Sequence, residues 1–190
     1  MSSTFVPLKQ FHVERLEPRV RASQRLFKLT LTPEAVAAMV AGPAQALLVG
    51  GEPVAAAGLI DEKEGRARAW ALFGEQDLSE RQWGEIVVAM RAGIEQALHP
   101  VTGWAQRVYA ETVYNWREGN LLLLHLGLSF EGMNRGAFPG GRHGVTYARV
   151  RGDVPPLPVR CSATMRIVEK CLWEDTMDRD VPYAARREAA

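Results

Sequence analysis

The sequence predicts an α+β fold in which a mixed, mostly antiparallel sheet is flanked by helices, with an extension at each end of the chain. Three observations favour this fold. Short apolar segments separated by turn residues follow one another between residues 46 and 73, as in a meander of strands. A capped helix with one apolar face follows them, and residues 106–135 then have the pattern of strand, turn, apolar helix, glycine and strand.

The composition is that of a globular protein large enough to bury a full core. The chain has 190 residues, of which 47% are hydrophobic and 24% charged, and its net charge is +1. Such a charge gives no overall field that attracts nucleic acid or a membrane. No apolar run approaches the ~20 residues that a membrane helix needs, so we expect no membrane contact.

We expect residues 1–45 to form an N-terminal arm and a first helix. Residues 1–30 carry six basic and two acidic side chains, so this segment alone has the charge to contact nucleic acid or an acidic protein face, the alternative being a solvated surface. Thr4–Leu8 suits an edge strand, because Pro7 lacks an N–H group for a central ladder. Thr32 and Pro33 then begin a helix that ends at Gly42.

The predicted core, residues 46–150, begins with three strands. Residues 46–49 and 53–60 are apolar and are joined by a turn that contains Gly50 and Gly51, which predicts a hairpin. A second turn follows, and residues 66–73 form the third strand.

A long amphipathic helix is expected over residues 80–98. Ser79 and Gln82 have the spacing of a capping box. Apolar residues recur behind them at helical intervals, and His99 with Pro100 closes the helix. The recurring positions are Trp83, Ile86, Val87, Met90, Ile94 and Leu98.

The remainder of the core repeats the alternation of strand and helix. Residues 107–113 alternate as a strand with two different faces, and residues 115–120 supply polar turn and capping groups. Residues 121–126 are almost wholly apolar, and Gly127 suits a left-handed helix end. A short strand at 128–130, a glycine-rich connection over 136–144 and a final strand at 145–150 complete the prediction.

These residues resemble the GNAT superfamily of N-acetyltransferases. The family pattern is an Asn, an apolar helix that ends in Leu-Gly-Phe, and a strand with a Phe, a Gly and an Arg. Here these places are held by Asn115, Leu126-Gly127-Leu128, Phe130-Glu131-Gly132 and Arg135, with Leu128 replacing the usual Phe. Within that family the chain is most similar to the GNAT-like proteins of short-tailed bacteriophages, including internal virion proteins. They share a Trp-Ala-Leu strand, an acidic turn with Trp, and an Asn–Arg turn.

The resemblance implies a site for coenzyme A, and the loop that would hold its pyrophosphate departs from the family pattern. Arg81 and Gly84 keep the first positions of that pattern, whereas Ile86 stands where a small residue is needed. Residues 74–85 carry a net charge of −3, which opposes a phosphate dianion by about 1 kcal/mol per charge even in a water-like dielectric. Trp83 adds bulk, so we expect no cofactor, the alternative being an unusual pocket for acetyl-CoA.

The catalytic groups that the resemblance implies are also incomplete. Family members often use a tyrosine as general acid at the position of Leu123, and leucine donates no proton. Glu111 is the sole carboxylate inside a predicted strand near the cleft, so it is the candidate general base. Its alternative role is an ion pair with Arg107 or Arg117. His125 is expected to be a core histidine, and no Cys/His cluster indicates a metal site.

Residues 151–190 differ in character from the core. A proline-rich spacer is followed by a segment that Ser162 can cap as a helix. Its apolar face is expected to bind a neighbouring molecule or to fold back on the core, and consists of Met165, Val168, Leu172 and Trp173. Two cysteines ten residues apart and no leader-like segment suit the host cytoplasm or a particle assembled there.

The function expected from the sequence is that of a structural or accessory bacteriophage virion protein on a catalytically silent GNAT-like fold. Its terminal arms would contact copies of the chain or other virion proteins. The alternative is an active acetyl-CoA-dependent N-acetyltransferase, with Glu111 as the base and the backbone near residues 72–74 holding pantetheine. A third alternative is a regulatory module that binds an acyl-CoA or a protein without turnover. The fold alone does not choose among them.

Overall fold

The computed structural model describes residues 3–20, 31–138 and 140–153. The expected interface residues Met165, Val168, Leu172 and Trp173 lie outside the described residues, as does part of the basic N-terminal segment. The elements, in chain order, are β1 (Ser3–Pro7), α1 (Gln10–Leu16), the 3-10 helix η1 (Glu17–Arg19), α3 (Pro33–Ala41), β2 (Ala44–Val49), β3 (Glu52–Asp61), β4 (Arg66–Phe73), α4 (Glu80–Ala97), β5 (Arg107–Val113), α5 (Arg117–His125), β6 (Ser129–Phe138) and β7 (Arg142–Val150).

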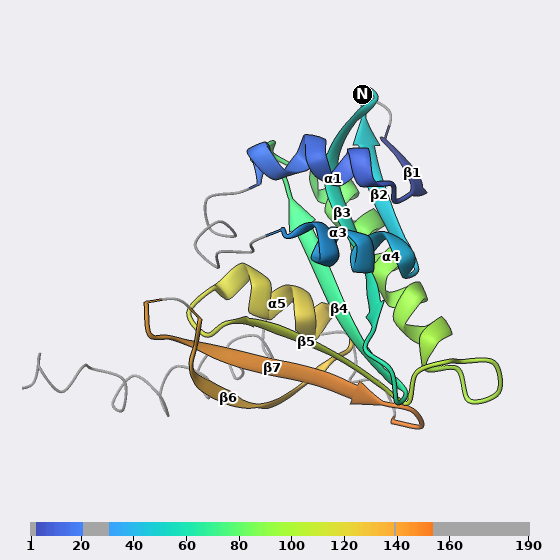
Figure 1. The fold of residues 1–190 in the computed structure, drawn as a ribbon, viewed down its shortest axis with the longest axis vertical. Coiled ribbons are helices and arrows are strands. Elements are labelled where there is room, and N and C mark those ends of the chain that lie inside the picture. Colours follow the sequence, from blue (N-terminus) through green and yellow to red (C-terminus); the bar gives the residue numbers. More distant parts are fainter. Residues whose placement is uncertain (1–2, 21–30, 139, 154–190) are drawn as a thin grey trace, which may run out of the picture. The chain divides into compact units, whose positions relative to one another are not determined.

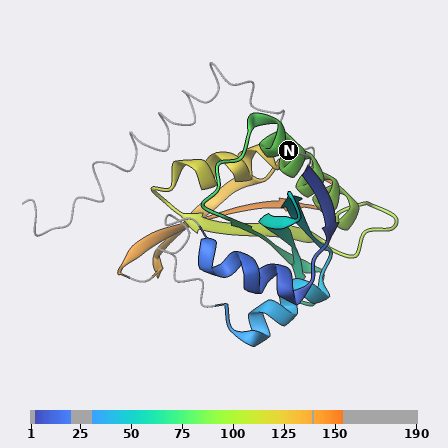
Figure 2. The same cartoon turned by 90° about the horizontal axis from the view of Figure 1, so that it is seen from above.

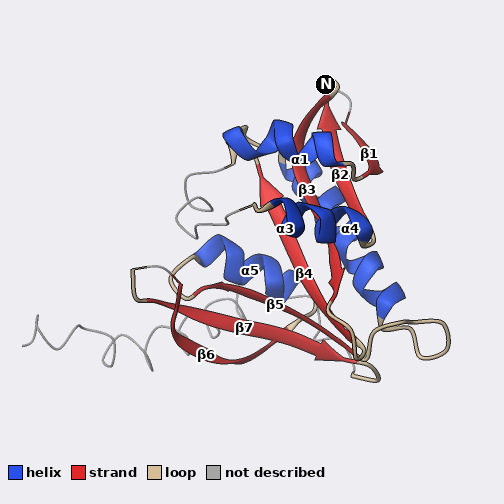
Figure 3. Cartoon of the chain, viewed as in Figure 1, coloured by secondary structure: helices blue, strands red, loops and turns tan. Residues whose placement is uncertain are grey.

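All seven strands belong to one sheet, in the order β1-β2-β3-β4-β5-β7-β6 (Figure 1). Every neighbouring pair is antiparallel except β4 and β5, which run parallel. The predicted α+β fold with a mixed, mostly antiparallel sheet is therefore confirmed. Figure 3 shows the same strands in red between the helices.

The parallel pair is the irregular point of the sheet. β4 and β5 are paired only from Arg66 with Arg107 to Arg68 with Tyr109. Beyond that point the two strands diverge from a common end, as Figure 1 shows. A sheet that opens between two neighbouring strands leaves a gap in its middle, and side chains from both strands and from the helices above border that gap.

Helices cover the sheet on both faces. Figure 2 shows α1 and α3 on one face and α4 and α5 on the other. Leu16 of α1, Met39 of α3 and Leu72 of β4 are buried in one cluster beneath the first pair. Ile94 of α4 and Tyr147 of β7 belong to a larger cluster beneath the second pair.

The capping residues act as their sequence pattern predicts. The Ser79 hydroxyl accepts from the Gln82 N–H group, and the Gln82 side chain accepts from the Ser79 N–H group. Thr32 caps α3 by accepting from the Ala35 N–H group at 3.2 Å. These bonds satisfy backbone donors that the first turn of a helix leaves without partners, and they fix where α3 and α4 begin.

The expected N-terminal arm contributes to the sheet and to the core in its described part. β1 pairs with β2 along its whole length and forms one edge of the sheet, as the proline in Thr4–Leu8 predicts. Helix α1 follows it, and Leu8, Val13 and Leu16 are buried. The sequence does not predict α1 because the helix has seven residues and no side chain of the usual capping type.

Two predictions for the last part of the core are wrong in detail. Helix α5 begins at Arg117, and its cap is Trp116, which makes no side-chain capping bond, so Asn115 does not cap it. The glycine-rich connection at 136–144 is largely a hairpin, because β6 extends to Phe138 and β7 starts at Arg142. Glycines with positive φ at 136, 140 and 141 allow that hairpin to bulge and turn.

Within the described residues, no helix combines the length and the apolar character needed to cross a membrane.

Candidate active site where two strands part

A cavity of about 70 Å³ lies where β4 and β5 separate. Strand β5 contributes Glu111 and Thr112 to its walls, and α5 contributes Gly119 and Leu123. The rest of the lining is apolar or aromatic and comes from β4, α4, β5, α5 and the cap of α5: Ala69, Trp70, Ala71, Phe73, Met90, Ala110, Trp116 and Leu122. The sheet, α4 and α5 therefore meet at one hollow.

Thr112, one of the residues that line this cavity, carries a buried hydroxyl group. Its side chain is 5% exposed, and its Oγ1 atom has no hydrogen-bond partner among the described residues. Helix α5 approaches closely here, since a Cβ atom at Gly119 would lie 2.6 Å from Thr112 Oγ1. A buried hydroxyl without a partner costs about 1–3 kcal/mol, and a polar group of a bound molecule would remove that cost.

Glu111 projects to the opposite side of the sheet, because neighbouring strand residues alternate between faces. It is exposed, and its Oε1 atom accepts a 2.9 Å hydrogen bond from Asn134 Nδ2 and a 3.4 Å bond from Thr146 Oγ1. Arg107, one of the two arginines expected as an ion-pair partner, contacts Glu131 instead. The carboxylate of the predicted base is thus held by neutral donors beside the opening.

The same face carries a charged group where the strands begin to part. Glu62 contacts Arg68 at 3.1 Å and accepts a 2.5 Å hydrogen bond from the Tyr109 hydroxyl group. Burial and this bond raise the pKa of Tyr109 above its usual value. Tyr109 and Glu111 share one face of β5, so a molecule that reaches Glu111 from this side also meets Tyr109.

Asn120 joins the end of β5 to the start of α5. Its amide donates to the carbonyl groups of Val113, Tyr114 and Trp116 at 2.8–3.3 Å, and its Oδ1 atom accepts from the Tyr147 hydroxyl group at 3.0 Å. Burial raises the pKa of Tyr147 to about 12, so this phenol keeps its proton. The sequence predicts no site role for either residue, and the one local signal is that the polar Asn120 directly precedes the apolar run 121–126.

The predicted phosphate loop is poorly suited to an anion. Arg81 is 86% exposed in its side chain and pairs with Glu85 at 2.8 Å, a bond that lowers the pKa of Glu85. The capping bonds of Ser79 already use the Gln82 N–H group, and the Gly74 N–H group donates to Val54 at 2.9 Å. Gly84 faces open space. The acidic side chain in the first turn of α4 and the hydrogen bonds already made there oppose the binding of a pyrophosphate at this helix start.

Three other positions complete the placement of the predicted residues. Leu123 lines the cavity, and the tyrosine that the resemblance implies there is absent. His125 lies half-buried at the end of α5, and His143 Nδ1 accepts from the Gly136 N–H group at 3.1 Å within the β6–β7 hairpin. No group of three or more His, Cys, Asp or Glu side chains with metal-binding geometry occurs within residues 3–20, 31–138 and 140–153.

Solved acetyltransferases share this architecture. The ribosomal-protein-S18-alanine N-acetyltransferase from Escherichia coli superposes with a TM-score of 0.56 at 14% identity, over 80% of this chain and 96% of that chain. An N-acetyltransferase from Staphylococcus aureus Mu50 gives 0.60 at 11%, over 80% and 100%, and a GNAT-family acetyltransferase from Bacillus anthracis gives 0.57 at 12%, over 80% and 97%. The chain has a GNAT-like fold.

No family model and no curated protein sequence matches the chain. At these identities the GNAT likeness concerns the fold, and the chemistry of the chain has to be argued from its own side chains. The neighbours are acetyltransferases, so they support the GNAT part of the resemblance and give no support to its bacteriophage part.

Proposed function

We propose that the chain is an N-acyltransferase that takes an acyl thioester into the opening between β4 and β5. The observation that carries this proposal is that Thr112 and Glu111, neighbours on β5 at that opening, place their side chains on opposite faces of the sheet. Thr112 lines the cavity and carries a buried hydroxyl group with no hydrogen-bond partner among the described residues, and Glu111 places its carboxylate on the opposite face of the sheet. A thioester on one side and an amine on the other would meet between them.

The proposed reaction uses these two groups in different ways. The amine nitrogen attacks the thioester carbonyl carbon, and Glu111 accepts the proton that the nitrogen releases. The carbon–sulfur bond then breaks, the new amide is formed, and the sulfur leaves as a thiolate that takes a proton from water. The Thr112 hydroxyl group forms one hydrogen bond with the acyl donor and so holds this donor in the opening.

In this proposal the protein binds the acyl carrier mainly through its pantetheine part and the thioester. Asp77 and Glu80 lie at the start of α4, where the helix dipole alone would favour an anion. Their charges oppose a pyrophosphate there. We therefore expect acetyl-CoA to bind more weakly than in a protein whose loop supplies free N–H groups, with most of the free energy coming from the thioester end.

The test is calorimetry and thiol release with acetyl-CoA and a set of primary amines and protein N-termini. We expect binding by the purified chain, and transfer that Glu111→Gln abolishes without weakening donor binding. Asn134→Asp is the matched variant: it keeps a side chain of the same size beside Glu111 but replaces the donor by a second acid. It should slow transfer less than Glu111→Gln does. Transfer that survives Glu111→Gln would contradict the assignment.

A catalytically silent protein on the same fold is the second candidate. The acidic start of α4 and the leucine at 123 favour it, because both remove groups that a GNAT transferase uses. The expected virion role, with assembly contacts through the terminal segments, is one form of this candidate. Absence of acetyl-CoA binding at millimolar concentration, with the fold intact by circular dichroism, would support it and overturn the transferase proposal.

A further inference from the structure

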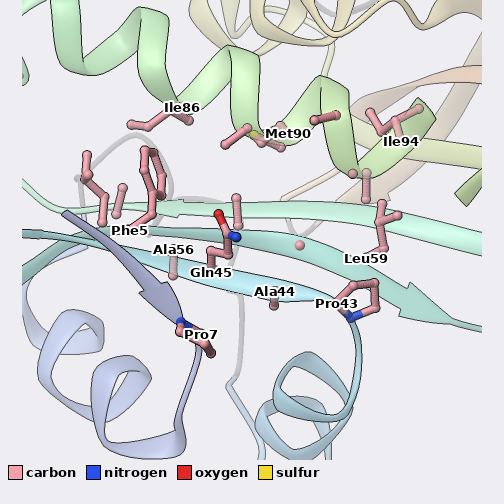
Figure 4. A pocket seen from close by; sticks show the side chains of 18 of the residues that line it. Phe5, Pro7, Pro43, Ala44, Gln45, Ala56, Leu59, Ile86, Met90 and Ile94 are labelled. Atoms are coloured by element: carbon pink, nitrogen blue, oxygen red, sulfur yellow. The ribbon is translucent and has the colours of Figure 1, made fainter. Parts of the chain in front are cut away.

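A second and larger cavity lies beneath helix α4. It has a volume of about 420 Å³ and is bordered by α4 on one side and by β1, β2, β3 and β4 on the other. In Figure 4 the side chains of Ile86, Met90 and Ile94 descend from the helix, and Phe5 and Ala56 belong to the strands opposite. This volume is within the range of about 300–1,000 Å³ that small-molecule sites occupy.

The walls of this cavity are chemically uniform. None of its lining residues is charged, and the only polar side chains are those of Gln45 and Gln96. Such walls offer no partner to a phosphate, a carboxylate or an ammonium group, and leaving such a group without one is costly. They suit a hydrocarbon chain.

Small side chains create the space. On β3 the floor is formed by Ala55, Ala57 and Gly58, and on α4 the wall includes Ala89 and Gly93. A Cβ atom at Gly58 would lie 2.4 Å from that of Ala44, so this glycine lets β2 and β3 pack. A Cβ atom at Gly93 would meet nothing within 4 Å. Gly93 therefore lowers the stability of α4 about as much as any glycine inside a helix. No neighbouring atom is close enough to exclude a larger side chain at this position.

The larger cavity adjoins the opening between β4 and β5. Ala69 and Met90 line both hollows, and both hollows are on the α4 side of the sheet. Methionine is flexible and unbranched, so the Met90 side chain can move aside at little cost. A movement of the Met90 side chain would therefore join the two hollows and let an aliphatic chain on a thioester in the opening enter the cavity under α4.

We propose that the cavity under α4 binds the aliphatic chain of the acyl donor. This inference rests on the proposed function and makes it narrower: the preferred donor is a medium- or long-chain acyl thioester, and acetyl is a poor substitute. Each methylene that enters the cavity should raise donor affinity about fourfold. The burial of the aliphatic chain also offsets the weak binding of the phosphate groups of the carrier.

The experiment compares acetyl, octanoyl and decanoyl thioesters of coenzyme A, and decanol as a probe without a thioester. Gly93→Leu projects a side chain into the cavity, and the control Val88→Leu enlarges an exposed side chain of the same helix, 68% exposed in the wild type. We expect decanoyl to bind at least tenfold more tightly than acetyl. We expect Gly93→Leu to remove that advantage and decanol binding, while it leaves the acetyl donor and the folded state unchanged.

Each outcome separates this inference from the proposed function. Acetyl transfer without any preference for chain length, or a preference that survives Gly93→Leu, would overturn the inference and leave the transferase intact. If no acyl group is transferred, the proposed function fails, and decanol binding abolished by Gly93→Leu would still support an aliphatic cavity. Should decanol not bind, and should Gly93→Leu instead dissolve a dimer, the cavity belongs to a second copy and the inference is overturned.

Discussion

Glu111 and Thr112 are neighbours on one strand, yet they serve opposite faces of the sheet. The alternation of side chains on β5 sends the carboxylate to one side and the hydroxyl group to the other. They occur just beyond Tyr109, the last residue that β5 pairs with β4. A position one residue earlier would exchange the two faces, so the register of β5 decides which side receives the thioester.

Replacing Thr112 by valine should separate stability from function. Valine keeps the shape and removes a buried hydroxyl group that has no partner among the described residues, so we expect the free energy of unfolding to rise by about 1 kcal/mol. Donor binding should weaken if the hydroxyl group holds the donor. Urea denaturation and calorimetry measure the two effects. Thr112→Ser, which keeps the hydroxyl group, should retain binding. A loss of stability in Thr112→Val would mean that the hydroxyl group is satisfied.

Tyr147→Phe should have the opposite effect on stability. The change leaves Asn120 Oδ1 buried without the donor that now lies at 3.0 Å, which costs about 1–3 kcal/mol. The hydroxyl group of Tyr109 offers a half-buried control, and Tyr109→Phe should cost less. The free energy of unfolding is measured by urea denaturation. An equal decrease in the two variants would show that the buried bond to Asn120 contributes no more than the half-buried bond of Tyr109.

The raised pKa of Tyr147 also predicts an alkaline loss of stability. The folded protein holds the phenol proton up to about pH 12, whereas the unfolded chain releases it near pH 10. Stability should therefore fall as pH rises through this interval, because the unfolded state binds fewer protons there. Tyr147→Phe should lack this part of the decline. Parallel pH profiles of the two proteins would contradict the assignment.

Helix α4 is tied to β7 by an ion pair that the sequence could not reveal. Arg149 is 8% exposed, and its guanidinium group contacts both carboxylate oxygens of Glu95 at 2.5 and 3.0 Å. The two residues are 54 positions apart, and neither lies in a motif. Because α4 forms one wall of both cavities, this pair helps to hold their dimensions.

Glu95→Gln should destabilise the protein by about 1–3 kcal/mol, since it leaves a buried guanidinium group opposite a neutral partner, although Glu95 itself is half exposed. Hydrogen bonding from Arg149 lowers the pKa of Glu95 in the folded state. This contribution is therefore present above the pKa of a free Glu and is lost as pH falls through the lowered value. The acid limb of the stability profile should be flatter in Glu95→Gln. Unchanged acid unfolding would contradict the role of the pair.

The start of α4 is where charge can be tested most directly. Asp77→Lys removes one negative charge and adds a positive one beside the helix terminus, so acetyl-CoA affinity should rise several-fold at low salt. The gain should shrink at high ionic strength. Glu14→Lys, on α1 at the other face of the sheet, makes the same charge change and should have little effect. Similar gains in both variants would indicate general attraction and not a local site.

How well each element could be predicted depends on how local its signal is. Strand β4 and helix α4 carry their own alternation, period and capping box, and the predicted ranges agree with the structure. Helix α1 has no such signal. The glycines over residues 136–144 predict a loop, whereas the structure forms the β6–β7 hairpin there. In the site, Glu111 could be proposed from its strand. The bond between Asn120 and Tyr147 and the burial of the Thr112 hydroxyl group depend on contacts between segments that are distant in the sequence.

At the scale of the whole molecule, the likeness to acetyltransferases concerns the fold, and the residues of the site have to be judged separately. The described chain shares its fold with solved acetyltransferases at identities of 11–14%, and its own sheet parts between β4 and β5 and has helices on both faces. Leu123 offers no proton donor, and acidic residues lie at the start of α4, where the GNAT resemblance of the sequence implies a phosphate site. Our two proposals are that the protein binds its donor through the acyl end or that it transfers no acyl group. The comparison of donors with different chain lengths distinguishes the two.

The position of β1 at the edge of the sheet has a consequence for biosynthesis. Phe5 and Pro7 of β1 help to line the large cavity, and the residues of α4 that face them come some eighty positions later in the chain. Until α4 emerges, the apolar floor between them is open to water and to other nascent chains. The synthesis of α4 is therefore the step that covers this apolar floor and protects it from association with other chains.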